Sequence, residues 1–147
     1  MRKKLDHRDR TLVLWWDTEY EGAAIYALVD DDGKMYIGRT YTLQKRLHTH
    51  RRALNCARAG ERGYTYEGHR LIDAAAAGKN FHAIVLKSIP PEKASENEVR
   101  YWECYYYQLY GKRRKPNEIA YNLYNSTLPT APNYAYKPND IPRKTVT

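Results

Sequence analysis

The chain has 147 residues, enough for one hydrophobic core, so we expect a single folded domain with short extensions. It is 42% hydrophobic and 29% charged, as globular proteins are, and has no apolar run near the about 20 residues that a membrane helix needs. The charged N-terminal segment lacks the apolar stretch of a signal peptide. We therefore expect an intracellular, cytoplasmic protein without a membrane partner. Cys56 and Cys104 belong to no Cys-x-x-Cys pair, so neither a disulfide framework nor a zinc site is predicted.

The net charge of +8 is concentrated in one part of the chain. Between Gly33 and Gly60 there are seven basic residues and no acidic residue, whereas the rest of the chain holds 18 basic and 17 acidic residues. A local positive field of this kind attracts phosphate backbones and makes binding salt-dependent. A solubilising charged face explains such a run equally well, so charge alone leaves both interpretations open.

The first expected elements form a β-hairpin. Residues 1–21 are interpreted as an N-terminal extension, whose apolar stretch either adds a strand or packs across the core. Residues 23–29 predict a buried strand, the acidic and glycine-containing segment 30–33 predicts a turn, and residues 34–38 predict the second strand.

Two helices are expected next. Thr42 is placed to cap a helix over residues 43–59, in which leucines recur on one face at helical spacing. A glycine-containing loop is expected over residues 60–68. An alanine-rich helix is predicted from Arg70 to Ala77, where Gly78 ends it.

The last expected elements are a strand and a long helix. Residues 81–89 predict a third strand, and residues 92–110 predict a helix. The expected buried stripe of this helix is Val99, Trp102, Tyr106 and Leu109. This order predicts an α+β fold with a small central antiparallel three-stranded β-sheet flanked by helices. We place the domain at residues 22–125 and a Pro/Asn-rich C-terminal tail at residues 126–147.

Several short motifs occur in an ordered set. Ala24-Ile25-Tyr26 is followed ten residues later by Tyr36-Ile37-Gly38, and Arg46 lies in the next expected helix. The downstream motifs are Glu98 shortly before Tyr101-Trp102, and then Tyr121-Asn122. The set resembles the GIY-YIG endonuclease family over about two thirds of the chain, with Ala24 in place of the first motif's glycine. The resemblance implies a magnesium-dependent nuclease domain, as in homing, restriction and phage or mobile-element nucleases.

Hydrolysis of a phosphodiester bond requires that a water is deprotonated and that charge on the phosphoryl oxygens is neutralised. Tyr26 and Tyr36 lie on paired strands, so their hydroxyls converge if both point to the same face. The resemblance implies that one of them, with Tyr26 as first choice, orients or deprotonates the attacking water. A free tyrosine has a pKa of about 10 and is a poor base, so nearby cations such as Arg46 have to lower that pKa. Ordinary sheet tyrosines are the alternative interpretation.

Arg46 suits a phosphate group, because its planar guanidinium contacts two oxygens at once and stays protonated. His50 lies one helical turn later on the same face. It either shares in proton transfer and phosphate contact or is an ordinary solvated histidine. The basic neighbours expected to contact nucleic acid are Arg39, Lys45, Arg51 and Arg52.

The metal ligand is expected on the long helix. Glu98 and Glu103 flank its buried stripe on opposite sides, so helical periodicity does not choose between them. The resemblance implies Glu98, just upstream of the aromatic pair, as the carboxylate for a single Mg²⁺ or Mn²⁺, with water and phosphate oxygens completing the coordination. Glu103 is then expected to be a solvated surface carboxylate. Asn122 is expected to contact the phosphate or to hold Glu98 through its amide.

The sequence thus predicts a DNA endonuclease that cuts one strand per active site, and a dimer is one way for such a site to cut a duplex. Two alternatives are a non-catalytic nucleic-acid-binding or regulatory module on the same scaffold, and a basic protein-binding domain. The joint presence of Tyr26, Tyr36, Arg46 and Glu98 favours catalysis. DNA recognition is expected from loops such as residues 60–68 and 112–115, or else specificity is low.

Overall fold

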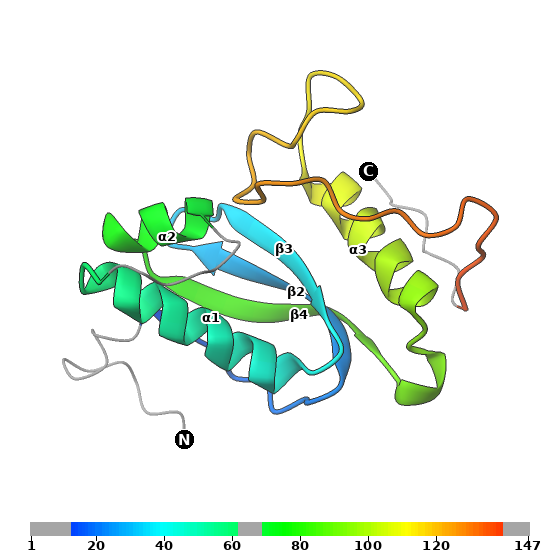
Figure 1. Cartoon of the computed structure of the whole chain (residues 1–147), viewed down its shortest axis with the longest axis horizontal. Coiled ribbons are helices and arrows are strands. Elements are labelled where there is room, and N and C mark those ends of the chain that lie inside the picture. The colour runs from blue at the N-terminus through cyan, green and yellow to red at the C-terminus, as the bar shows by residue number, and fades with distance from the viewer. Residues whose placement is uncertain (1–12, 62–68, 140–147) are drawn as a thin grey trace.

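The computed structural model describes residues 13–61 and 69–139, and the expectations for residues 1–12, 62–68 and 140–147 lie outside this part of the chain. Four strands form one mixed sheet in the order β1-β4-β2-β3 (Figure 1). β2 (Ala23–Asp30) pairs antiparallel with both β3 (Met35–Thr40) and β4 (Phe81–Ile89). β1 (Leu14–Trp15) pairs parallel with β4.

The sheet differs from the expected one by this additional strand. The α+β class is confirmed, and the three predicted strands are antiparallel neighbours. The sheet as a whole is nevertheless four-stranded and mixed, so the prediction of a three-stranded antiparallel sheet is wrong in that respect. Since β1 is two residues long, it is too short to show an alternating pattern in the sequence.

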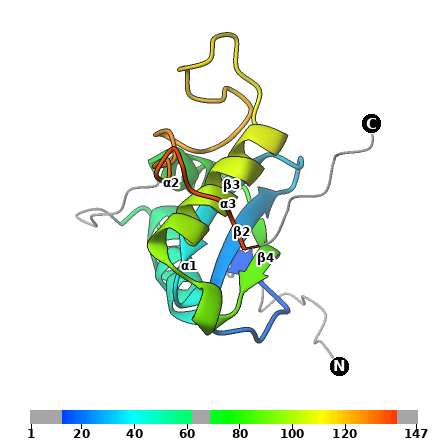
Figure 2. The ribbon, with the colours of Figure 1, turned by 90° about the vertical axis from the view of Figure 1, so that its right-hand side faces the viewer.

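Helices cover both faces of the sheet (Figures 1 and 2). α1 (Leu43–Arg58) and α2 (His69–Ala76) lie on one face, and α3 (Glu96–Tyr110) lies on the other. Strand β2 is central and buried on both sides: Tyr26 and Leu28 pack with the core of α1, whereas Ile25 and Ala27 pack with the core of α3. This double burial explains why β2 is a continuous apolar run.

The turn of the predicted hairpin is held by one side chain. Oδ1 of Asp30 accepts hydrogen bonds from the backbone N–H groups of Asp32, at 2.8 Å, and Lys34, at 2.9 Å. Gly33 has φ of +89°, a conformation that glycine adopts without steric cost. The turn aligns β2 with β3 so that Tyr26 pairs with Gly38 and Leu28 pairs with Tyr36.

Helix α3 begins later than the sequence indicates. Residues Pro91–Lys93 form a short 3-10 helix, η2, and the Ser95 side chain then caps α3 by accepting from the N–H of Glu98 at 3.1 Å. The prediction that Leu109 is buried is wrong, because it is 41% exposed and Tyr107 is buried instead. Near the C-terminal end of α3, the buried side of the helix is therefore the side of Tyr107 and not that of Leu109.

After α3 the chain forms a loop over residues 111–122 and then returns to the sheet. Residues 123–125 run beside the outer edge of β3, where Leu123 bridges to Met35 and the N–H of Tyr124 donates to the Met35 carbonyl at 2.7 Å. Residues 126–139 continue along α3 as an irregular strap (Figure 2). Within the described ranges, none of the helices has the length and apolar character needed to span a bilayer.

Candidate active site

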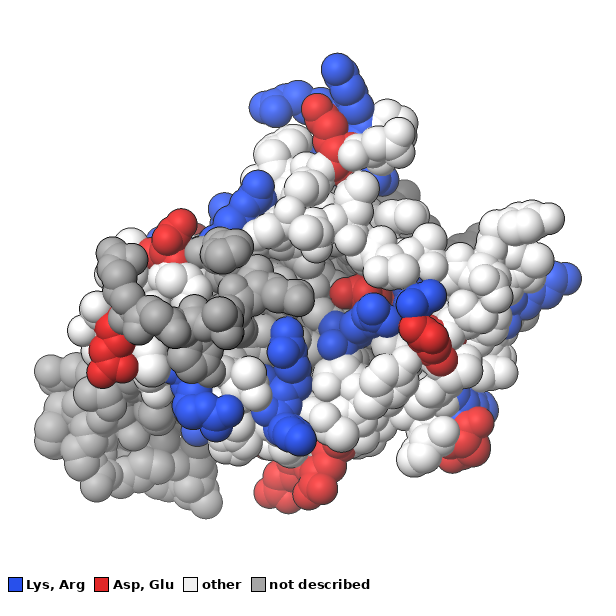
Figure 3. Space-filling model, viewed as in Figure 1, with Lys and Arg blue, Asp and Glu red and all other residues white. Residues whose placement is uncertain are grey.

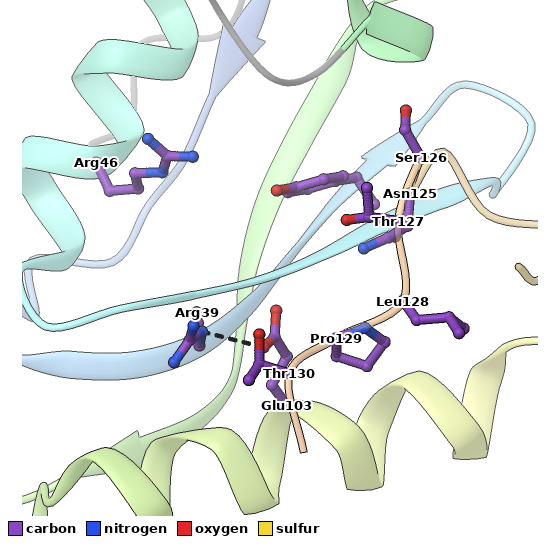
Figure 4. A pocket seen from close by; sticks show the side chains of 10 residues that line it. Arg39, Arg46, Glu103, Asn125, Ser126, Thr127, Leu128, Pro129 and Thr130 are labelled. Carbon is purple, nitrogen blue, oxygen red and sulfur yellow. Dashed lines mark ion pairs between the residues drawn. The ribbon is translucent and has the colours of Figure 1, made fainter. Parts of the chain in front are cut away.

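A pocket of about 520 Å³ opens along the outer side of β3 (Figure 4). Strand β3 contributes Tyr36 and Arg39, α1 contributes Arg46 and α3 contributes Glu103. Residues 125–130 form the remaining wall. Because β3 is an edge strand, side chains from helices on both faces of the sheet reach the same space. The fold thereby brings together three residues expected from the sequence, Tyr36, Arg39 and Arg46.

The two motif tyrosines lie on the α1 face of the sheet. Their ring centroids are 6.4 Å apart. Tyr36 lines the pocket, whereas Tyr26 is 1% exposed and lies behind it. A Cβ atom added at Gly38 would lie 2.5 Å from the Cζ and hydroxyl oxygen of Tyr26. The glycine of the second motif therefore provides the space in which the Tyr26 ring crosses β3.

His50 is the inner partner of Tyr26. It is 1% exposed, and its Nε2 lies 2.7 Å from the Tyr26 hydroxyl oxygen. Burial, together with the charge of Arg46, lowers the pKa of His50 from 6.5 to about 3, so its imidazole is neutral at neutral pH. With the ring proton on Nδ1, Nε2 accepts the proton of the Tyr26 hydroxyl. His50 is thus not a solvated histidine.

Arg46 connects this buried pair to the pocket. Its Nε donates to the Tyr26 hydroxyl oxygen at 3.4 Å, and the same side chain lines the pocket. In Figure 4 the guanidinium points from α1 toward the space above β3. A cation in this position favours negative charge both on the Tyr26 oxygen and on a group that enters the pocket.

Glu103 faces the pocket from α3. Its Oε1 lies 3.1 Å from Nε of Arg39, and its side chain is 13% exposed (Figure 4). Burial raises the pKa of Glu103 from 4.5 to about 7, although the charge of Arg39 acts in the opposite direction. The prediction that Glu103 is a solvated surface carboxylate is therefore wrong.

Glu98, the expected metal ligand, lies outside the pocket and is 1% exposed. Its Oε2 accepts from Nε1 of Trp102 at 2.9 Å. Its Oε1 accepts from the Tyr136 hydroxyl and, at 3.0 Å, from the N–H of Asn139. Oε2 is thus bound within α3 and Oε1 holds the strap, which leaves Glu103 as the acidic residue among those that line the pocket.

Asn122, at the end of the loop, does not make its expected contacts, and Asn125, for which no role was predicted, lines the pocket instead. Asn122 contacts neither Glu98 nor the pocket: its Oδ1 accepts from the N–H of Lys112 at 2.7 Å, and its Nδ2 donates to the carbonyl of Tyr110 at 3.0 Å. Asn125 lines the pocket and binds β3 through both ends of its amide. It accepts from the N–H of Ile37 at 2.9 Å and donates to its carbonyl at 2.8 Å.

The remaining residues expected to contact nucleic acid lie on α1. Lys45 and Arg52 are exposed. Arg51 is partly buried, because its Nε donates to the Leu14 carbonyl at 3.0 Å and its guanidinium stacks over the Trp16 ring at 4.2 Å. Arg51 therefore joins α1 to β1, whereas Lys45 and Arg52 present their charge to the surroundings.

In the described part of the chain, the His, Cys, Asp and Glu side chains form no group of three or more that could hold a metal ion. A single carboxylate such as Glu103 fits Mg²⁺, since this ion often keeps water and substrate phosphate oxygens as its other ligands. The arrangement thus fits a cation that binds together with a phosphate.

Comparisons of the chain with protein-family models, with curated proteins and with solved structures give no match. The resemblance to the GIY-YIG family therefore stays a prediction from the motif residues.

Proposed function

We propose that the pocket beside β3 hydrolyses phosphodiester bonds in DNA, in the manner of a GIY-YIG endonuclease, with Mg²⁺ or Mn²⁺ as cofactor. One observation carries the proposal: Tyr36, Arg46 and Glu103 come from three different elements and line one pocket. A phenol, a guanidinium and a carboxylate are the groups that position a phosphate, neutralise it and hold a divalent ion.

The arginines bind the phosphodiester group. Arg46 offers a planar fork that contacts two phosphoryl oxygens at once, and it remains protonated at any working pH. Arg39, on the opposite wall, pairs with Glu103 at 3.1 Å. A phosphate that enters between the two arginines gains a second cationic contact from Arg39. Tyr36, which lines the pocket, orients the phosphate or the attacking water.

Tyr36 accepts the proton of the attacking water, because it is the motif tyrosine that lines the pocket, whereas Tyr26 is buried behind it. The phenolate oxygen of Tyr36 takes the proton, the water oxygen forms the new bond to phosphorus, and the phenol then loses its proton to solvent. The bond between phosphorus and the leaving oxygen breaks, and that oxygen takes a proton from solvent. Tyr26 and His50, with 2.7 Å between the hydroxyl oxygen and Nε2, position Arg46, whose Nε lies 3.4 Å from the same oxygen.

Glu103 would hold the divalent ion through its carboxylate. When bound, Mg²⁺ supplies positive charge to the phosphoryl and leaving oxygens. Glu103 has to be ionised for this role, and Arg39 favours its ionised form. The ion pair of Arg39 and Glu103 thus keeps the carboxylate oriented toward the pocket before substrate arrives.

A plasmid-cleavage assay tests the proposal. Wild-type protein is expected to cut in Mg²⁺ and not in EDTA, and Arg46→Ala to lose cutting. Glu103→Gln is expected to lose metal-dependent cutting, whereas Glu98→Gln is expected to keep it. Glu96→Gln, on the exposed side of the same helix, is the matched control. If wild-type protein binds DNA but never cuts it, the chain is a nucleic-acid-binding module instead; if Glu98→Gln alone abolishes cutting, our choice of Glu103 is wrong.

A further inference from the structure

The loop over residues 111–122 has a fixed neck. Its two ends meet where the N–H of Tyr121 donates to the Lys112 carbonyl at 3.0 Å. Asn122 closes the neck a second time, through bonds to the N–H of Lys112 at 2.7 Å and to the Tyr110 carbonyl at 3.0 Å. A loop whose ends are clamped in this way is an Ω-type loop that projects as a unit. Figure 1 shows it standing out beyond the C-terminal end of α3.

Internal contacts fix the rest of the loop. The Arg113 guanidinium donates to the Pro116 carbonyl, and Oε1 of Glu118 accepts from the N–H of Lys115 at 3.2 Å. The loop therefore does not have to become ordered when it binds a partner, which lowers the entropic cost of binding.

The loop carries a concentrated positive charge. Residues 111–122 include four basic residues in succession and one acidic residue, Glu118. Lys112, Arg114 and Lys115 are exposed, and the described part of the chain gives them no acidic side-chain partner. Figure 3 shows basic side chains at the end of the projecting loop and others over α1. Such a site attracts a polyanion.

An aromatic ring lies among these cations. Tyr121 is 54% exposed, and the guanidinium of Arg114 lies over its ring at 4.8 Å from the centroid. Both side chains line an open hollow of about 610 Å³ within the loop. Aromatic rings and arginine planes stack on unpaired bases, while neighbouring cations follow the phosphates. A duplex does not offer the face of a base in this way.

The loop is also close to the candidate active site along the chain. Tyr121 lies four positions before Asn125, which lines the pocket. An extended chain of this length spans at most about 14 Å, equal to about four nucleotide steps of a duplex strand. A strand that is cut in the pocket therefore reaches the loop within a few nucleotides.

We propose that residues 111–122 bind an unpaired segment of the nucleic-acid substrate, with a base stacked on Tyr121 and Arg114 and with phosphates on Lys112 and Lys115. The proposal rests on the proposed function, because it names the kind of DNA that the same site acts on. A substrate with a single-stranded stretch beside the scissile bond is then bound more tightly than a continuous duplex.

Binding measured by fluorescence anisotropy in EDTA tests the stacking part without any cleavage. The probes are a labelled single-stranded oligonucleotide and a duplex of the same sequence. Tyr121→Ala is expected to weaken binding of the single strand between about 5- and 150-fold, the range for loss of one stacked base. Duplex binding should change little, and Tyr121→Phe should restore single-strand binding. Tyr134→Ala, which removes a fully exposed tyrosine elsewhere, is the matched control.

A salt titration tests the phosphate part. For the Lys112→Ala/Lys115→Ala variant, the slope of log affinity against log salt should decrease in magnitude by about 1.4, which corresponds to two lost contacts to a single strand. The control is Lys79→Ala/Lys137→Ala, with the same charge change outside the loop. Thermal unfolding verifies that each variant is folded.

The two proposals fail in different ways. Equal binding of the single strand by wild type and Tyr121→Ala would overturn the inference, as would equal losses for single strand and duplex. Either result is independent of whether the wild type cuts DNA. If the wild type cuts no DNA but Tyr121→Ala shows the expected selective loss, the loop inference stands and the proposed nuclease function falls.

Discussion

The hydroxyl oxygen of Tyr26 lies 2.7 Å from Nε2 of His50, and both side chains are 1% exposed. The pair joins β2 to α1 through a polar contact inside a largely apolar layer. Buried polar groups are costly unless they are paired, so each residue depends on the other. Arg46 gives the pair its connection to the pocket, because it contacts Tyr26 and lines the cavity.

Removal of the Tyr26 hydroxyl should affect both stability and cutting. Tyr26→Phe deprives Nε2 of His50 of this partner, at a cost of about 1–3 kcal/mol in unfolding free energy. Loss of the oxygen that Nε of Arg46 contacts should also slow cutting, because Arg46 is then less well positioned in the pocket. The matched control is Tyr107→Phe, which removes another buried hydroxyl, one that accepts from the N–H of Ala120 at 2.6 Å. The control should lose similar stability and keep its cutting rate; equal losses of cutting in both variants would contradict a positioning role for Tyr26.

His50 and Glu103 have pKa values displaced in opposite directions. Burial lowers the pKa of His50 from 6.5 to about 3, so in that interval the unfolded chain binds a proton that the folded chain lacks, and stability rises with pH. Burial raises the pKa of Glu103 from 4.5 to about 7, so there the folded chain binds a proton that the unfolded chain lacks, and stability falls as pH rises. Each group contributes a slope of at most about 1.4 kcal/mol per pH unit.

The two slopes should therefore offset each other between pH 4.5 and 6.5. Relative to wild type, the unfolding free energy of Glu103→Gln should rise with pH across this window, by about 1 kcal/mol per unit. That of His50→Gln, which keeps an amide near the position of Nε2, should fall with pH relative to wild type. Urea unfolding at several pH values measures both differences. If the unfolding free energy of each variant changes with pH in the same way as that of the wild type, the pKa values of His50 and Glu103 are not shifted in the folded chain.

Gly38 controls the position of Tyr26. Because an added Cβ would lie 2.5 Å from the tyrosine Cζ and hydroxyl oxygen, Gly38→Ala should displace the ring and break its contact with His50. We expect a loss of about 1–3 kcal/mol in stability, as for other overpacked sites, together with slower cutting. A double-mutant cycle with Tyr26→Leu provides the test. Since the shortened side chain frees the space, Gly38→Ala should cost less in that background, whereas additive losses would exclude the clash as the cause.

The hairpin and α1 could be predicted from sequence because their signals are local. Burial of β2 on both faces requires an apolar run, Asp30 and Gly33 mark the turn, and leucines recur on α1 at helical spacing. Tyr36 and Arg46 were expected to be functional residues, and the fold brings them to one pocket. Their chemistry stays a prediction until cutting is measured.

The choice between Glu98 and Glu103 could not be made from helical periodicity. The two residues flank the same buried stripe, and a helical wheel does not state which flank faces β3. That depends on how α3 crosses the sheet. Arg39 on the neighbouring edge strand would have favoured Glu103, since a partly buried arginine needs an acidic partner.

Asn125 was missed for a related reason. Its bonds to Ile37 join residues 88 positions apart, so they depend on the register with which residues 123–125 meet β3. The sequence offers two asparagines three positions apart, and only this register makes one face the sheet edge while the other closes the loop neck.

Glu98 should be important for the strap. Glu98→Gln keeps the size of the side chain but replaces one acceptor oxygen by a donor, which faces N–H and O–H donors already present. We expect a loss of about 1.5–3 kcal/mol, the range for hydrogen bonds to a charged group. Amide hydrogen exchange of residues 131–139 should become faster, while Glu96→Gln leaves it unchanged. Unaltered exchange in Glu98→Gln would show that the strap is held by other contacts.

Asn122 and Asn125 provide a paired comparison, because the same substitution removes two different clamps. Asn125→Ala leaves the N–H and carbonyl of Ile37 without partners at a buried edge, at a cost of about 1–3 kcal/mol for each group. Tyr36 flanks Ile37, so we also expect slower cutting. Asn122→Ala acts at the more exposed loop neck, where water replaces the lost bonds, so its cost should stay near or below about 1 kcal/mol.

The readouts for this pair are urea unfolding, cutting of a short duplex and hydrogen exchange. Asn122→Ala should speed exchange within residues 111–122, because the loop loses the side chain that closes its neck, and should leave short-duplex cutting intact. Asn125→Ala should leave hydrogen exchange within the loop slow, speed exchange at the edge of β3 and slow the cutting of the short duplex. If Asn122→Ala slows cutting more than Asn125→Ala does, Asn122 takes part in the active site after all, and our correction of its role is wrong.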